Sequence, residues 1–152
     1  MDVKMINPFI DAIMTIMPQL GFQNIVKGKL SVGDQFVESK GITVLVGLTD
    51  QLRGNIAYNL KEETAMQIAS KMMMGMPVTS LDELAQSAIS ELTNMVTGNA
   101  ATNFEKEGLR VDISPPSIVV GENFKVKVSS TKFLVVEMVA DSLVIELNIG
   151  IG

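Results

Sequence analysis

The chain has 152 residues, a net charge of −5 and a hydrophobic content of 47%, values that predict one folded domain over residues 1–152 with a core of its own. It contains no cysteine and no histidine, which excludes disulfides, thiol nucleophiles, histidine acid–base catalysis and zinc sites built from those residues. No basic run favours nucleic acid binding and no apolar run reaches the ~20 residues of a membrane helix, so we expect a soluble cytoplasmic protein without a nucleic acid or membrane partner.

The N-terminal third is predicted to form one helix and then three strands. Apolar residues recur at three- and four-residue spacing from Met5 to Met17, and Pro18 and Gly21 follow, which predicts an amphipathic helix that ends there. Residues 25–32 and 42–49 predict two strands, the second buried because it is almost continuously apolar. Alternation over residues 55–60 after a turn completes a hairpin.

Two helices are predicted in the middle of the chain. The first begins at Glu62 and Glu63, which favour a helix N-terminus, and ends at Gly75 and Pro77. Its end is rich in methionine, interpreted as core packing with one exposed side chain: Met72, Met73, Met74 and Met76. The second helix is predicted from about residue 81 to Glu107. Its apolar stripe is expected to comprise Leu81, Leu84, Ala85, Ala88, Ile89, Leu92, Met95, Val96 and Ala100.

The C-terminal part of the chain is predicted to be rich in strands. Ser114-Pro115-Pro116 interrupts the chain, and strands are then expected at residues 118–120, 124–128, 133–140 and 143–149. The connections are of hairpin length, which favours antiparallel pairing. The predicted fold class is therefore α+β: a two-layer domain with three long helices packed on a mostly antiparallel sheet.

The candidate functional residues lie on the long second helix. Glu91 and Asn94 are three residues apart and therefore neighbours on its surface. Small residues surround them: Ser87, Ser90, Gly98 and Ala101. Gly98 costs the helix about 1 kcal/mol relative to alanine, and a floor of small side chains would let another surface approach closely. The alternative is that Glu91 and Asn94 are ordinary exposed residues.

Two other asparagines of this helix are expected to be structural, and the absence of several common motifs excludes other kinds of site. Asn99 and Asn103 fall near the apolar stripe, so we expect buried, hydrogen-bonded amides there. The sequence has no dinucleotide-binding glycine motif, P-loop, nucleophile elbow or calcium loop. No metal site and no cofactor of its own are therefore expected.

Residues 81–95 resemble the signature helix of the CheX family of bacterial chemotaxis phosphatases, which are relatives of CheC and of the FliY switch protein. Two flanking segments agree in order and spacing. Residues 63–76 resemble the preceding helix of the family, and residues 112–121 resemble its double-proline segment. The three segments together make the match specific.

The resemblance implies dephosphorylation of the response regulator CheY, which is phosphorylated on an aspartate. Glu91 and Asn94 match the family motif of an acidic residue, two spacers and an asparagine. By resemblance, Asn94 orients the attacking water and Glu91 pairs with a lysine of the regulator, which also supplies the magnesium. Ser87, Ser90 and Gly98 are expected to lie against the bound regulator.

The resemblance also bears on the number of sites and on assembly. CheC-type relatives carry two motifs, whereas the first helix here reads Asp11-Ala12-Ile13-Met14 and lacks the asparagine, which favours the single-site CheX type. CheX relatives form homodimers through joined sheets, and residues 142–149 are a candidate edge strand. The alternative function is a non-catalytic module of the same fold that binds receiver domains.

Overall fold

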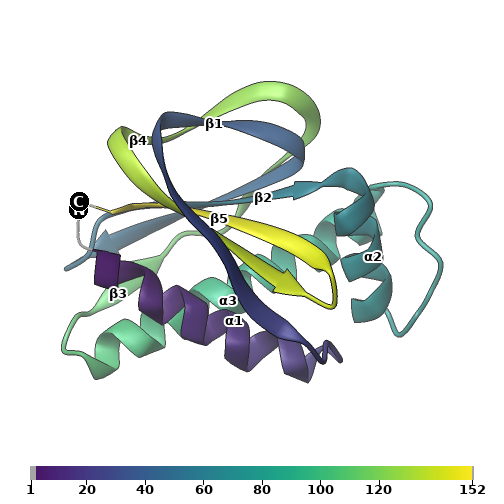
Figure 1. Ribbon diagram of the computed structural model, residues 1–152, viewed down its shortest axis with the longest axis horizontal. Coiled ribbons are helices and arrows are strands. Elements are labelled where there is room, and N and C mark those ends of the chain that lie inside the picture. Colours follow the sequence, from purple (N-terminus) through teal and green to yellow (C-terminus); the bar gives the residue numbers. More distant parts are fainter. Residues whose placement is uncertain (1–2, 152) are drawn as a thin grey trace.

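Residues 3–151 are described by a computed structural model in which three helices pack on one face of an antiparallel sheet (Figure 1). After a 3₁₀ turn at Val3–Ile6, the helices are α1 (Asn7–Gln19), α2 (Glu62–Met72) and α3 (Glu83–Lys106). The strands are β1 (Ile25–Asp50), β2 (Gly54–Lys61), β3 (Val111–Ile113), β4 (Ser117–Ala140) and β5 (Leu143–Ile151). The predicted α+β class and the three helices are confirmed.

The strands pair in the order β2-β5-β4-β1-β3, and β1 also pairs with β2, so the pairings form a closed circuit β1–β2–β5–β4–β1. All five registers are antiparallel. β1 and β4 are long enough to leave the sheet together as an arch, which rises on the side away from α1 and α3 in Figure 1. The predicted hairpin corresponds to β1 and β2, joined across residues 51–53.

The predicted strands at 25–32 and 42–49 are one continuous strand, and those at 118–120, 124–128 and 133–140 are another. The register between β1 and β4 shifts at three places, between Lys27 and Leu30, Asp34 and Phe36, and Glu38 and Lys40. Each shift interrupts the inward–outward alternation of side chains. The alternation of side chains in the sequence is therefore interrupted at points where each strand itself continues.

The main core lies between the sheet and the helices. Inward residues of β1 and β2 such as Val44 and Tyr58 are at most 1% exposed, and Phe9 of α1 packs edge-on against Phe104 of α3 with ring centroids 5.7 Å apart. A second, smaller cluster of Ala57, Val128 and Phe133 fills the space under the arch. No helix within residues 3–151 has the length and apolar character needed to cross a membrane.

The prediction that residues 142–149 form a free edge is wrong. β5 pairs with β4 on one side, from Leu134↔Ile149 to Ala140↔Leu143, and with β2 on the other, from Gly54↔Ile151 to Asn59↔Glu146. Both of its ladders are occupied, so it has no edge to offer a second sheet. Within the described part of the chain, residues 25–40 of β1 pair only with β4 and leave their other edge open.

Candidate functional site

Helix α3 begins with a side-chain cap that fixes where the candidate residues fall. Asp82 is extended, and its Oδ1 accepts the Ala85 N–H at 2.9 Å, satisfying one of the amides that a helix N-terminus leaves unpaired. Gln86 adds a hydrogen bond from Nε2 to the Leu81 carbonyl at 2.7 Å. From this start the helix runs straight across the sheet, beside α1 (Figure 1).

The exposed side of α3 carries both candidate catalytic residues. Glu91, Asn94 and Ser87 are exposed, whereas Ser90 and Gly98 are half-buried. The predicted projection of Glu91 and Asn94 into solvent is therefore confirmed.

The phase of the buried stripe differs from the prediction at three positions. Leu84, predicted in the core, is 64% exposed, and Thr93 and Thr97 are buried in its place. The two threonine hydroxyls donate to carbonyls of the same helix, those of Ser90 and Thr93, so their burial leaves no hydroxyl unsatisfied. Relative to the prediction, the buried face of α3 is thus shifted toward Thr93 and Thr97 and away from Leu84.

A second wall faces α3 across a groove and comes from the double-proline segment. Ser114 fastens this segment to β1: its N–H donates to the Gly47 carbonyl at 2.9 Å, and its Oγ accepts the Gly47 N–H at 2.7 Å. Pro115 and Pro116 follow directly and hold the chain in an extended course above the helix. The sequence marks this segment as a break and as a family signature, but its spacing does not place it opposite Asn94.

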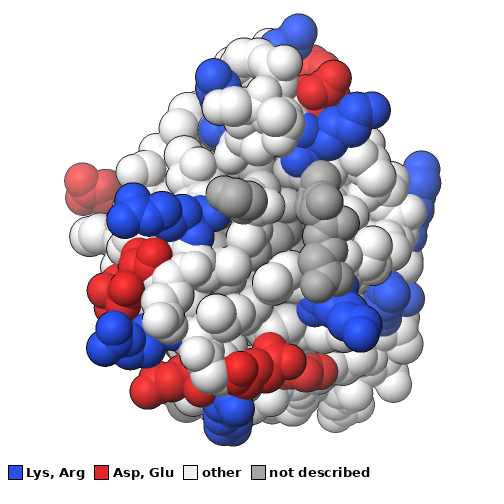
Figure 2. All heavy atoms as spheres, turned by 90° about the vertical axis from the view of Figure 1, so that its left-hand side faces the viewer, with Lys and Arg blue, Asp and Glu red and all other residues white. Residues whose placement is uncertain are grey.

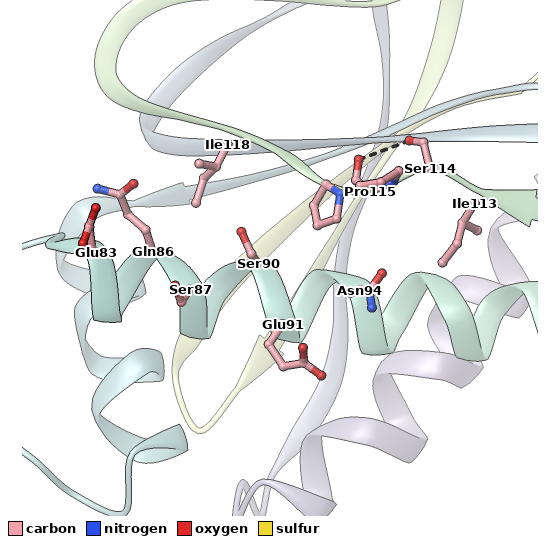
Figure 3. Close-up of a pocket in the computed structure, with 11 residues that line it drawn as sticks. Glu83, Gln86, Ser87, Ser90, Glu91, Asn94, Ile113, Ser114, Pro115 and Ile118 are labelled. Carbon is pink, nitrogen blue, oxygen red and sulfur yellow. Dashed lines mark hydrogen bonds between the residues drawn. The ribbon is translucent and has the colours of Figure 1, made fainter.

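The groove between the two walls is open and has a volume of about 860 Å³. Its α3 wall comprises Glu83, Gln86, Ser87, Ser90, Glu91 and Asn94, and its second wall Ile113, Ser114, Pro115, Pro116 and Ile118. Figure 3 shows Ser90 pointing toward the proline wall and Glu91 pointing away from it on the outer side of the helix. Gly98 lies one turn beyond Asn94, where a Cβ atom would be 4.0 Å from Ile113. The groove brings Ser87, Ser90, Glu91 and Asn94 together, whereas Gly98 is not one of its lining residues.

The groove is acidic. Glu83 and Glu91 are its only charged lining residues, and neither forms an ion pair within residues 3–151. A cation presented by a partner would therefore find an unpaired carboxylate beside Asn94. The described residues contain no group of three acidic side chains arranged to hold a metal ion. On the face in Figure 2, positive and negative side chains are interspersed around the rim, and the described residues form no extended basic area there.

The two other asparagines of α3 are structural in part. Asn103 donates from Nδ2 to the Pro8 carbonyl of α1 at 3.0 Å, which confirms the predicted hydrogen bond, but the residue is half-buried and not buried as predicted. Asn99 accepts from Asn103 at 3.4 Å but is only half-buried. The prediction of a largely buried Asn99 is therefore correct in its hydrogen bond and too strong in its burial.

The methionine cluster after α2 packs less than predicted. Met72 and Met73 are half-buried, but Met74 is 97% exposed and Met76 57% exposed. On α1, Asp11 and Met14 lie on the exposed side. The outer face of α1 carries no carboxamide at the position that corresponds to Asn94 in the motif.

Known proteins resemble this chain in sequence and in fold. A family model described as chemotaxis phosphatase CheX matches residues 42–138. A protein of Thermotoga maritima described as CheY-P phosphatase CheX is 38% identical over 128 residues, 84% of this chain and 82% of that protein. The Borrelia burgdorferi structure described as a CheX–CheY–BeF3–Mg²⁺ complex contains a chain 30% identical, with a TM-score of 0.82 and 99% of each chain covered. A CheC-like superfamily protein of Shewanella sp. PV-4 is 25% identical, with a TM-score of 0.86 over 100% of this chain and 99% of that one.

Proposed function

The chain belongs to the CheX family of chemotaxis phosphatases, and we propose that it hydrolyses the aspartyl-phosphate of a CheY-like response regulator. The observation that carries the proposal is the exposed pair Glu91 and Asn94, which match the family motif and line an open groove. The Thermotoga relative is described as a CheY-P phosphatase and the Borrelia relative as a complex with CheY, which supports the same partner class here.

In the proposed reaction, a water oxygen attacks the phosphorus and the bond between phosphorus and the aspartate oxygen breaks. The products are inorganic phosphate, released as H2PO4− with both protons of the water, and the free aspartate carboxylate. An acyl phosphate is already reactive, so the enzyme contributes mainly the position of the water. The Asn94 carboxamide has an acceptor and two donor hydrogens for that purpose. Within residues 3–151 the carboxamide makes no hydrogen bond, so its acceptor and both donor hydrogens are available to a partner.

Glu91 is proposed to dock on the regulator's phosphate-binding lysine. Its carboxylate is exposed and lies one turn from Asn94, and the lining of the groove offers no competing lysine or arginine. The magnesium ion in this proposal is held by the regulator, because the groove contributes only two separated carboxylates. Ser87, Ser90 and Gly98 are proposed to lie against the regulator, where their small size lets its active site reach Asn94.

We also propose that the protein is a homodimer. β5 is occupied on both sides, whereas, among the described residues, 25–40 of β1 and 117–133 of β4 pair on one side only, and we assign the joint to the β1 edge. Val26, Val32 and Phe36 on this segment are between 47% and 60% exposed, an unusual density of apolar surface beside an open strand edge. Light scattering is expected to give twice the 16.4 kDa chain mass. A monomer at micromolar concentration would contradict this assembly.

The test of the phosphatase proposal separates chemistry from docking. Asn94→Ala is expected to lower single-turnover phosphate release by ~10²–10³-fold, because the lost interaction acts chiefly in the transition state. Affinity for the regulator should change little. Glu91→Ala is expected to weaken regulator binding and to make it less sensitive to salt, since a charge pair is removed. Both side chains are exposed, so circular dichroism should show an unchanged fold.

Two outcomes would contradict the proposal. If the wild-type protein binds the phosphorylated regulator without shortening its lifetime, the chain is a binding module rather than a phosphatase. If a folded Asn94→Ala protein releases phosphate at the wild-type rate, another group positions the water. Decay of radiolabelled regulator phosphate, with and without the protein, distinguishes both cases.

A further inference from the structure

Hydrogen bonds from buried hydroxyl groups connect the sheet to the backbone of the turn of α3 that carries Glu91 and Asn94. Tyr58 lies on the helix-facing side of β2 and is 1% exposed, and its hydroxyl oxygen is 2.7 Å from Thr97 Oγ1. Thr97 Oγ1 donates to the Thr93 carbonyl at 2.6 Å, and Thr93 Oγ1 donates to the Ser90 carbonyl at 2.9 Å. We call these three side chains the hydroxyl relay. Its two parts meet at Thr93, whose carbonyl accepts from Thr97 and whose hydroxyl donates separately to the Ser90 carbonyl. All three side chains are buried, so water does not compete for the hydrogen bonds of the relay.

The direction of donation in the relay follows from counting hydrogens. A threonine hydroxyl carries one hydrogen, and a carbonyl oxygen can only accept. Thr97 donates its one hydroxyl hydrogen to the Thr93 carbonyl, so the hydrogen between Tyr58 and Thr97 comes from Tyr58. Burial raises the pKa of Tyr58 far above its ordinary value. Its hydroxyl therefore keeps the donated proton throughout the neutral range.

The relay ends on the backbone of the candidate catalytic turn. In an α-helix the carbonyl of residue 90 accepts the N–H of residue 94, and the carbonyl of residue 93 accepts the N–H of residue 97. The Ser90 carbonyl that receives the Thr93 hydroxyl is thus also the backbone partner expected for Asn94. Hydroxyls that bond to carbonyls one turn back alter the local course of a helix. The relay therefore acts on the backbone from which Asn94 projects.

We propose that Tyr58 is a positioning residue for the phosphatase reaction, which fixes the orientation of Asn94 through the Thr97 hydroxyl and the Thr93 carbonyl that precedes Asn94. This inference rests on the proposed function. Tyr58 and Thr97 are buried between the sheet and α3 and do not line the groove, so they do not contact the regulator. Their loss should alter how the water is held and leave the docking surface in place. A displacement of 1 Å in a catalytic group can cost ~10²-fold in rate, and a loosened turn should cost less, about 3–10-fold.

The experiment compares three variants of the full chain. Tyr58→Phe removes only the donating hydroxyl, Thr97→Val removes the next one at nearly constant volume, and Thr97→Ser keeps it. For Tyr58→Phe and Thr97→Val, we expect the single-turnover rate at saturating phosphorylated regulator to fall about 3–10-fold. Affinity for the regulator carrying beryllofluoride should stay within about 2-fold, since no docking contact changes. Thr97→Ser should recover most of the rate.

A control separates positioning from a general loss of stability. Val128→Ala truncates a 1% exposed residue under the arch, on the opposite face of the sheet, and should lower stability without changing the saturated rate. Wild-type rates in both Tyr58→Phe and Thr97→Val would overturn the inference. Equal losses in the Val128→Ala control would do the same.

The inference fails separately from the proposed function. An inactive wild-type protein refutes the phosphatase, whereas an active wild type with relay variants of unchanged rate refutes only the relay. Amide hydrogen exchange gives a readout independent of activity. In Tyr58→Phe, the amides of residues 94 and 97 should exchange faster than in wild type, while those of α1 should not change. Unchanged exchange at both amides would also overturn the role assigned to Tyr58.

Discussion

Gly98 offers a substitution whose effects on stability and on activity are expected to have opposite signs. Glycine within a helix costs about 1 kcal/mol relative to alanine. A Cβ atom at this position would have Ile113 Cδ1 as its nearest non-local neighbour at 4.0 Å, an ordinary van der Waals distance without a clash. Gly98→Ala should therefore stabilise the isolated protein by ~1 kcal/mol. For a chain of this length that corresponds to a rise in Tm of about 2–4 °C.

The same methyl group would lie on the face proposed to meet the regulator. The affinity of the Gly98→Ala protein for the beryllofluoride-bound regulator should therefore fall. Thr15→Ala on α1 is the matched control, because it also replaces an exposed helix residue by a better helix former and lies on another helix. It should raise Tm slightly and leave affinity unchanged. Differential scanning calorimetry and a fluorescence titration measure the two quantities. A lower Tm for Gly98→Ala would refute the packing argument, and an unchanged affinity would remove Gly98 from the docking face.

Three further predictions test separate parts of the molecule. Leu84→Ser should leave the free energy of unfolding within ~0.5 kcal/mol of wild type. It should weaken regulator binding about 10-fold if docking buries this leucine, which is 64% exposed. Met74→Ser is the control in the same titration, because Met74 is 97% exposed and lies outside the groove. Phe133→Ala should cost about 3–5 kcal/mol in urea unfolding, because the 1% exposed ring packs over Gly33 under the arch. Backbone N–H groups of Asn24 and Gln23 lower the pKa of Asp141 from its ordinary value of 3.8. The Asp141 carboxylate therefore contributes fully to the free energy of unfolding above pH 3.8, and this contribution is lost as the pH falls through the lower pKa of the folded state. The Tm difference between wild type and Asp141→Ala should close in that acidic range.

Elements that depend on local signals were predictable from the sequence. The acidic start and the Gly75 and Pro77 stop of α2 act within a few residues, and so does the Asp82 cap of α3. The hairpin of β1 and β2 is equally local. The continuity of β1 and β4 was not predictable, because the register shifts that break their alternation arise only when the two strands pair across about a hundred residues of sequence.

The phase of α3 was misjudged for a chemical reason. A hydrophobicity pattern assigns leucine to the core and threonine to the surface, which places Leu84 inside and Thr93 and Thr97 outside. The structure reverses this assignment, because each threonine hydroxyl is satisfied within the helix or by Tyr58. A satisfied hydroxyl can be buried at little cost. Burial of threonine in a helix thus depends on a partner that a helical wheel does not contain.

The candidate site divides in the same way. Its α3 wall follows from helix geometry, since residues three apart share a face, and the sequence alone was enough to group Glu91 with Asn94. Its second wall depends on Ser114, which is held by both backbone groups of Gly47, 67 residues earlier in the chain. That contact requires β3 to pair beside β4 on the same side of β1, and no local pattern encodes it. The residues proposed to perform the chemistry are therefore local in sequence, whereas the groove that presents them to a partner is a product of the sheet.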